Sequence, residues 1–215
     1  MADGARPGTP GSRGGHRAQV REAVARPGQR VLVHGFGPFL DVDDNPAGRL
    51  AEAVNGACVG RWSVVGEVMP VSYARAPALS AARARALDAS LLIGIGVATQ
   101  RSEVCVEARA VPEGHPEHAD VDGVILRRIA PDGAGAVAAT GPVEALARVL
   151  EGVVSTDAGR YVCNAWLYRT VRALRGEIPV LFVHVPPVGL QPARLLAALE
   201  QIQESPDGGW RQHSV

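Results

Sequence analysis

Apolar and polar positions follow one another along this chain in two different ways, and each pattern predicts a different kind of element. Short runs in which nearly every residue is apolar are typical of strands covered on both faces of a sheet. Such runs occupy residues 30–34, 90–96 and 179–185. A further strand is predicted over 62–71. The segment 103–111 alternates between small apolar and mostly polar residues, which predicts a strand with two unlike faces.

Other segments carry helix-forming residues, or apolar residues at helical spacing, and predict helices. These segments are residues 47–54, 74–89, 142–150, 159–175 and 192–202. Strands therefore alternate with helices, and residues 121–129 are expected to pair with the strand over 103–111. The predicted fold class is α/β, a three-layer α/β/α sandwich with a mixed, mostly parallel central sheet.

The two ends of the chain lack this periodicity. Residues 1–29 are rich in Gly, Pro and Arg and predict a disordered low-complexity leader. A polar tail is expected over 206–215, which leaves residues 30–205 as a single α/β domain of the 215-residue chain. No apolar run reaches the roughly 18–20 residues that span a bilayer, so no membrane partner is expected.

Composition and charge exclude several classes of function. The 22 basic and 22 acidic residues balance, which argues against a nucleic-acid partner, since general binders carry a broad basic surface. The chain contains no Lys, which excludes Schiff-base chemistry and a P-loop lysine. Its three cysteines include no CxxC pair, so a thiolate metal site is not expected. An odd number of cysteines favours the reducing cytoplasm.

Cys163 is the strongest candidate for chemistry. It follows a turn of small residues and lies in or near the first turn of the helix predicted over 159–175. The positive end of a helix dipole stabilises a thiolate and lowers the thiol pKa, as a cysteine nucleophile requires. The alternative is a buried structural cysteine that packs as a small hydrophobe, and the surrounding residues leave both interpretations open.

A histidine and a glutamate would complete the machinery of such a nucleophile. His184 ends a buried strand, where ligands of open α/β sheets bind, although His34 ends a similar run and either ring could merely satisfy a loop carbonyl. Glu107 shares a predicted strand face with Cys105 and Arg109. It would either orient a histidine or pair with arginine on a solvated face.

Two further patterns are weaker. Residues 35–39 read Gly-Phe-Gly-Pro-Phe and lack the third glycine of a dinucleotide-binding loop. Phe36 and Phe39 in this loop fit the wall of a small apolar pocket or ordinary core contacts. The spacing of His115 and His118 fits a metal site only weakly. We therefore expect neither a cofactor nor a metal.

These segments, in this order, resemble the pyroglutamyl-peptidase I (pyrrolidone-carboxylate peptidase) family of cysteine peptidases. The resemblance covers about residues 30–200. It rests on residues 31–39 followed by Asn45-Pro46, and then on 96–107, 158–164 and 182–186. It implies an α/β/α fold and an omega-peptidase that, without a cofactor, hydrolyses the bond after an N-terminal pyroglutamyl (5-oxoprolyl) residue.

The resemblance also implies roles for residues in the matched motifs. Cys163 is matched to the nucleophile, His184 to the base and Glu107 to the residue that orients this base. The implied partner is a peptide substrate with a blocked N-terminus. The assembly state is open, with a homo-oligomer among the alternatives.

Four residues are matched to substrate binding: Phe36, Phe39, Asn45 and Val97. The two phenylalanines match aromatics that sandwich the lactam ring. Val97 stands where the family has a glutamine that contacts the lactam, and a lost buried hydrogen bond typically costs ~1–3 kcal/mol. The alternative is therefore a non-catalytic or specificity-shifted homologue that binds a small cyclic amide or a peptide N-terminus. A nucleotide-binding or phosphorylase-like protein is a third, weaker hypothesis.

Overall fold

The computed structural model describes residues 1, 29–40, 42–131 and 133–204. Within these ranges the helices are α1 (Pro46–Val54), α2 (Arg75–Ala86), α3 (Val143–Val149), α4 (Val162–Leu174) and α5 (Pro192–Glu204). The strands are β1 (Gln29–Phe36), β2 (Cys58–Val59), β3 (Trp62–Met69), β4 (Ala89–Val97), β5 (Cys105–Glu107), β6 (Arg109–Ala110), β7 (Val137–Ala138), β8 (Val153–Ser155) and β9 (Val180–Val185). All five predicted helices and the three apolar strands lie within a few residues of their expected limits.

The described strands form one sheet of seven, in the order β2-β3-β1-β4-β9-β5-β8, and a separate pair, β6 and β7. In the large sheet β2 is antiparallel to β3 and β5 is antiparallel to β9, whereas the other neighbouring pairs are parallel. The sheet is thus mixed and mostly parallel, as predicted.

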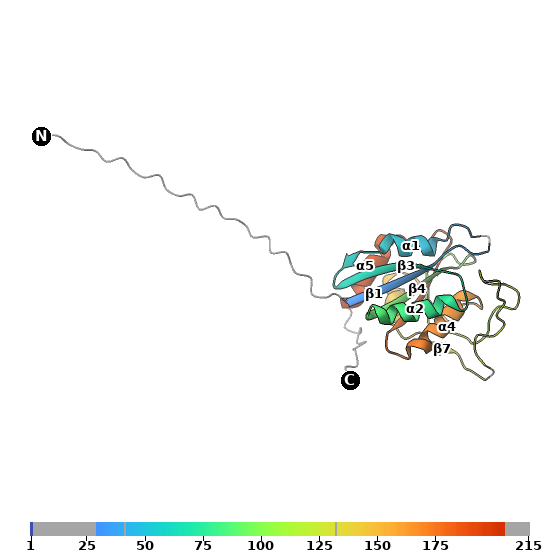
Figure 1. Cartoon of the computed structure of the whole chain (residues 1–215). Coiled ribbons are helices and arrows are strands. Elements are labelled where there is room, and N and C mark those ends of the chain that lie inside the picture. Colours follow the sequence, from blue (N-terminus) through green and yellow to red (C-terminus); the bar gives the residue numbers. More distant parts are fainter. Residues whose placement is uncertain (2–28, 41, 132, 205–215) are drawn as a thin grey trace.

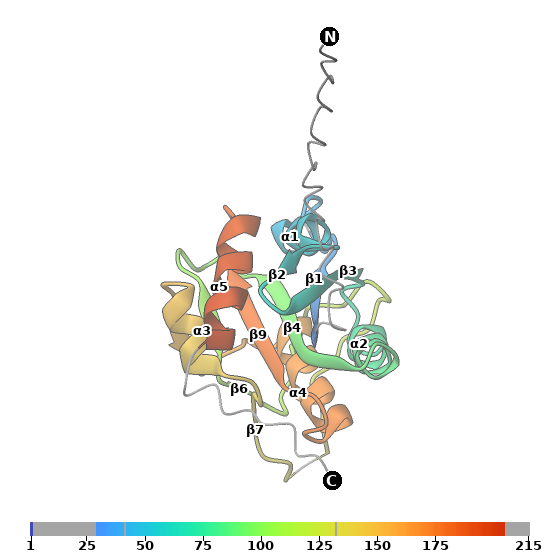
Figure 2. The same ribbon diagram turned by 90° about the vertical axis from the view of Figure 1, so that its left-hand side faces the viewer.

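Helices cover both faces of this sheet (Figures 1 and 2). Helices α1, α3 and α5 share one apolar core with alternate strand residues, and α2 and α4 share a second core with the remaining ones. The strands β1, β4 and β9 contribute to both cores, which explains why their residues are apolar at consecutive positions. The predicted α/β/α sandwich is confirmed.

The alternation along β4 shows how the sequence places α4. Ile93 and Ile95 point into the core beneath α1, α3 and α5. Gly94 and Gly96 point to the opposite face, where α4 lies unusually close. A Cβ atom at Gly94 would lie 2.6 Å from the Trp166 ring, and one at Gly96 would lie 2.7 Å from Sγ of Cys163. These two glycines therefore let the first turns of α4 lie directly on the sheet.

The middle of the chain departs from the prediction. The strand expected over 103–111 is divided, because β5 joins the large sheet between β9 and β8 whereas β6 pairs with β7. The expected pairing of 121–129 with this strand is wrong. Arg128 instead forms an isolated bridge to Glu113, beyond the end of the predicted strand. A strand of two or three residues has too short a pattern to be recognised, and β2, β7 and β8 were missed for that reason.

The expected leader and tail lie outside the described residues, apart from Met1 and Gln29, and Gln29 is the first residue of β1. The limits of the predicted domain stay a prediction. Among the helices of the described ranges, none combines the length and the apolar character needed to cross a membrane.

A buried polar network ties β1 to α2 and α4. Trp166 donates from Nε1 to Oγ of Ser80 at 2.8 Å, and this hydroxyl lies 2.7 Å from Nδ1 of His34. The Ser80 hydroxyl therefore links the indole of Trp166 to the ring of His34. Burial lowers the pKa of His34 to about 4, and Glu67, 3.5 Å from the other ring nitrogen, opposes that shift. His34 is therefore a neutral part of the core at neutral pH.

The lowered pKa of His34 predicts a loss of stability in acid. The unfolded chain takes up a proton at this ring near pH 6.5 and the folded chain only near pH 4, so the free energy of unfolding falls as pH drops between these values. We expect urea unfolding to report a decrease of about 2–3 kcal/mol between about pH 7.5 and pH 4.5. His34→Gln, which keeps a polar partner for Ser80 but does not titrate, should flatten this part of the profile. An unchanged slope in that variant would contradict the assignment.

Candidate active site

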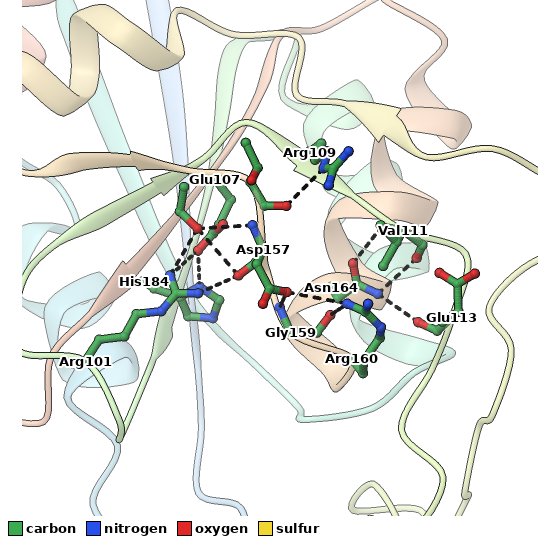
Figure 3. A network of polar contacts seen from close by, with 12 residues as sticks. Arg101, Glu107, Arg109, Val111, Glu113, Asp157, Gly159, Arg160, Asn164 and His184 are labelled. Atoms are coloured by element: carbon green, nitrogen blue, oxygen red, sulfur yellow. Dashed lines mark hydrogen bonds and ion pairs between the residues drawn. The ribbon is translucent and has the colours of Figure 1, made fainter.

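His184 and Glu107 form a buried pair at the end of the large sheet (Figure 3). Nδ1 of His184 lies 2.7 Å from Oε1 of Glu107, and the two residues are 5% and 0% exposed. The antiparallel register of β5 and β9 sets Cys105 opposite His184, so Glu107, two residues along, points to the same face of the sheet. A carboxylate on Nδ1 fixes the orientation of the ring and leaves Nε2 as the nitrogen that can exchange a proton.

Arg101 holds the other side of this carboxylate. From the loop after β4 it donates through Nη1 to Oε1 of Glu107 at 2.6 Å, and through Nη2 to the carbonyl oxygen of Asp157. The guanidinium thus fixes Glu107 and links it to the segment before α4 (Figure 3). Oε2 of Glu107 is buried without a hydrogen-bond partner among the described residues. The sequence placed Arg101 in a matched motif but assigned it no role.

Cys163 lies on the same face of the sheet as His184. It is the second residue of α4, which begins three residues later than predicted, and its Sγ lies over Gly96 of β4. Gly96 is the register partner of His184 on the parallel neighbour β9. Residues paired in this way point to the same face, so the thiol and the imidazole lie above adjacent strands. The structure therefore brings Cys163, His184 and Glu107 together at one edge of the sheet.

The thiol pKa does not follow the prediction. Burial, and secondarily the negative charge of Glu107, raises the pKa of Cys163 to about 12, although its own backbone N–H and Arg101 act in the opposite direction. The expectation that the helix dipole lowers this pKa is therefore wrong for the free protein. Desolvation of the sulfur between α4 and the sheet is the largest contribution to this shift.

This raised pKa predicts how the free protein reacts with alkylating agents. Only the thiolate reacts, so the rate at which iodoacetamide modifies Cys163 should rise about tenfold per pH unit from about pH 7 to about pH 10 without levelling off. Mass spectrometry of proteolytic peptides would follow Cys163 separately from the exposed Cys58, which serves as the internal reference. A rate that is already constant by about pH 8 would contradict the raised pKa.

Aromatic rings lie beside the start of α4. Phe39 faces Tyr161, the residue before α4, with ring centroids 6.0 Å apart and planes inclined by 33°. Phe36 is 3% exposed and packs on Phe182, whose ring in turn lies 5.0 Å from that of His184. The two matched phenylalanines thus have different surroundings. Tyr161 was not among the predicted residues, although it precedes Val162-Cys163 in a matched motif.

The remaining matched residues occupy the borders of this region. Asn45 caps α1: its side chain accepts from the Ala47 N–H at 3.0 Å and donates to the Gly37 carbonyl at 2.8 Å, which fixes the loop that carries Phe39. Val97 is the last residue of β4 and is 9% exposed. The resemblance implies a glutamine at this position, whereas valine presents only an apolar surface.

A further asparagine, beside Cys163, was overlooked by the sequence analysis. Asn164 is fully buried, accepts from the Val111 N–H at 2.8 Å, and donates to the carbonyl oxygens of Val111 and Glu113 at 3.0 Å. It ties the loop after β6 to the first turn of α4 (Figure 3). Its position directly after Cys163 in the motif was the available signal.

The weaker patterns have structural explanations. Gly35 approaches α1 so closely that a Cβ atom there would lie 1.9 Å from the carbonyl oxygen of Ala47, so this glycine serves packing. The rings of His115 and His118 stack with centroids 4.0 Å apart, next to Tyr161. In the ranges that the structure describes, no three His, Cys, Asp or Glu residues are grouped to hold a metal.

Known proteins resemble this chain in sequence and in fold. A family model described as pyroglutamyl peptidase matches residues 29–197. A pyrrolidone-carboxylate peptidase of Saccharolobus islandicus is 33% identical over 164 residues, which cover 73% of this chain and 78% of that protein. One of Cupriavidus taiwanensis is 32% identical over 175 residues, covering 76% and 81%. The solved pyrrolidone carboxyl peptidase from Thermococcus litoralis has a TM-score of 0.71 at 27% identity, covering 80% of this chain and 90% of that one. The chain therefore belongs to the pyroglutamyl peptidase family.

Proposed function

We propose that this protein is a cysteine peptidase that removes an N-terminal pyroglutamyl residue from peptides, with Cys163 as nucleophile, His184 as base and Glu107 as the residue that orients the base. The observation that carries the proposal is the 2.7 Å contact between Glu107 and His184, on the sheet face where Sγ of Cys163 lies over Gly96. Family membership supplies the substrate class, and this geometry supports the assignment of the residues.

Attack begins with proton transfer, because burial keeps the thiol of Cys163 protonated in the free protein. The proton passes from Sγ to His184 while Sγ bonds to the pyroglutamyl carbonyl carbon. Glu107 stabilises the imidazolium that forms, and Arg101 holds Glu107 in place. The carbon–nitrogen bond then breaks, and the leaving amine takes the proton from His184. Water attacks the thioester and gives a proton to His184. The carbon–sulfur bond then breaks, pyroglutamate leaves, and the sulfur takes the proton back from His184.

The start of α4 supplies donors for the oxyanion. Tyr161 at the N-cap makes no side-chain hydrogen bond to the first turn, so the N–H groups at Val162 and Cys163 are available to the carbonyl oxygen of the substrate. The positive end of the helix dipole, which does not suffice to ionise the buried thiol, here stabilises charge that develops only during the reaction.

The lactam ring is placed against Phe39 and Tyr161. It is small and flat, and two inclined aromatic rings beside the nucleophile suit it. Phe36 supports this wall from the core through Phe182, and Asn45 holds the loop of Phe39. With Val97 in place of the family glutamine, backbone groups must supply the hydrogen bonds to the lactam.

The same proposal covers the setting of the enzyme. Its partner is a peptide with a blocked N-terminus. We place the enzyme in the cytoplasm, because all three cysteines are free and Cys58 is exposed, as a reducing compartment permits. A measurement of its mass in solution would show whether the enzyme is a homo-oligomer.

The proposal is tested with pyroglutamyl-coumarylamide and matched alanyl- and prolyl-coumarylamides, with and without a reducing agent. Release of coumarin from the pyroglutamyl substrate alone, abolished by thiol alkylation, is the expected result. The apolar Val97 specifically favours one rival, a protein that binds a cyclic amide without cleaving it. Thermal stabilisation by 2-pyrrolidone with no hydrolysis would establish that rival and overturn the proposal.

A further inference from the structure

A cavity of about 470 Å³ lies where β4 and β9 end. Seven residues line it: Thr99, Gln100, Arg101 and Ser102 from the loop after β4, and Pro186, Pro187 and Val188 from the loop after β9. The two loops are tied together by a hydrogen bond from the Ala98 N–H to the Val185 carbonyl at 2.9 Å. The cavity is thus built on the ends of two paired, buried strands.

This cavity adjoins the buried His184–Glu107 pair. Pro186 lies two residues beyond His184, and Arg101, which forms another part of the lining, donates to Oε1 of Glu107. Neither Phe39 nor Tyr161, the proposed lactam wall, lines it. The cavity and the aromatic rings therefore belong to different sides of the site.

We infer that this cavity receives the first residue of the leaving peptide, the one that follows pyroglutamate; the inference rests on the proposed function. In that reaction His184 gives its proton to the leaving amine, so the amine must come within hydrogen-bond reach of the imidazole. The acyl side of the substrate is occupied by Cys163 and the aromatic wall. The chain beyond the amine therefore continues past His184, where the loops of this cavity begin.

The chemistry of the lining predicts which side chain is preferred. None of the seven residues is acidic, and the guanidinium of Arg101 is engaged by Glu107. Pro186, Pro187 and Val188 form an apolar wall, and Val188 is 87% exposed. A large apolar side chain after pyroglutamate would cover Val188 and gain the free energy of removing apolar surface from water. A cationic side chain would find no counter-charge in the lining.

The test measures kcat/KM for pyroglutamyl-leucine amide, -glycine amide and -lysine amide. The wild-type enzyme should prefer the leucine substrate over the glycine substrate by about tenfold or more, as a methylene-rich contact in a pocket provides. Val188→Asp should reduce this ratio about tenfold and raise the relative rate for lysine. Val188→Leu should keep the ratio within about twofold.

Two further variants test where the residue that follows pyroglutamate binds. Leu79→Asp introduces the same charge at an exposed apolar residue of α2, which does not line the cavity, and should leave the ratio unchanged. His118→Ala alters the histidine stack beside Tyr161, on the side of the proposed lactam wall. A leucine-to-glycine ratio that stays constant in Val188→Asp, or that changes only in His118→Ala, overturns the inference. A wild-type protein that cleaves no pyroglutamyl substrate overturns the proposed function itself.

Discussion

Replacing Cys163 with serine should reduce kcat for a pyroglutamyl amide by about 10⁴-fold or more, because the hydroxyl is a weaker nucleophile and the remaining site only binds and polarises the substrate. The side chain is nearly isosteric and lies in the same contact with Gly96, so we expect the free energy of unfolding to change by no more than about 1 kcal/mol. Steady-state kinetics and urea unfolding of the same preparation provide both values.

Cys105 offers a matched control for this substitution. It is a buried cysteine that lies opposite His184 in the register of β5 and β9. Cys105→Ser therefore makes the same chemical change beside the same histidine, and kcat should fall less than about tenfold. If Cys105→Ser abolished turnover and Cys163→Ser did not, the nucleophile would be misassigned.

Replacing Glu107 with glutamine should lower kcat by about 10³- to 10⁴-fold, the second-largest effect we expect. The amide keeps the shape of the side chain but removes the charge that stabilises imidazolium His184, and its NH₂ group can favour the wrong tautomer of the ring. The loss should fall mainly on kcat, because Glu107 does not line the proposed lactam site. Arg101 also loses its carboxylate, which we expect to lower stability by about 1–3 kcal/mol.

Glu103→Gln is the matched control, since Glu103 lies on the same segment and is exposed. Its kinetics should match the wild type within about twofold. Arg101→Met distinguishes the effect of the Glu107 charge from the effect of its placement. The variant leaves the contact between Glu107 and His184 but removes the group that fixes the carboxylate. Its loss of kcat should therefore be smaller than that of Glu107→Gln. Retention of a tenth or more of wild-type kcat in Glu107→Gln would remove Glu107 from the mechanism.

The layers of the fold could be predicted because their pattern is local. A buried parallel strand needs apolar residues at every position, and residues 90–96 and 179–185 carry that signal within one short window. The helices follow from spacing and propensity in the same way. Strand order in the sheet depends on contacts between distant segments, and only its mixed, mostly parallel character was predicted.

The region between β5 and α3 could not be predicted from local patterns. Its strands have two or three residues, and β5 is held by β9 and β8, which come much later in the chain. The alternation over 103–111 correctly placed Glu107 and Cys105 on one face. It could not show that the chain leaves the large sheet after Glu107, because its next partner, β7, comes much later in the chain.

The pKa of Cys163 shows the same limit for the site. Its place in the first turn of α4 could be predicted from the small residues before it, and the helix dipole was inferred from that place alone. The opposing effect comes from burial against Gly96 and from the charge of Glu107, which are neighbours only in the folded protein. Arg101 and Tyr161 lie in matched motifs, but no role could be assigned to either from the sequence. Their contacts, too, form only in the folded protein.

The account depends on one covalent event, the acylation of Sγ in Cys163 by the pyroglutamyl group. The wild-type enzyme is mixed with a pyroglutamyl nitrophenyl ester, whose leaving group needs no proton from His184, and the reaction is quenched rapidly. This procedure should trap the thioester for mass spectrometry. We expect one pyroglutamyl group on the peptide that contains Cys163, formed and lost at rates that account for turnover. Ester turnover with no adduct on Cys163, or with the adduct on another residue, would contradict the account.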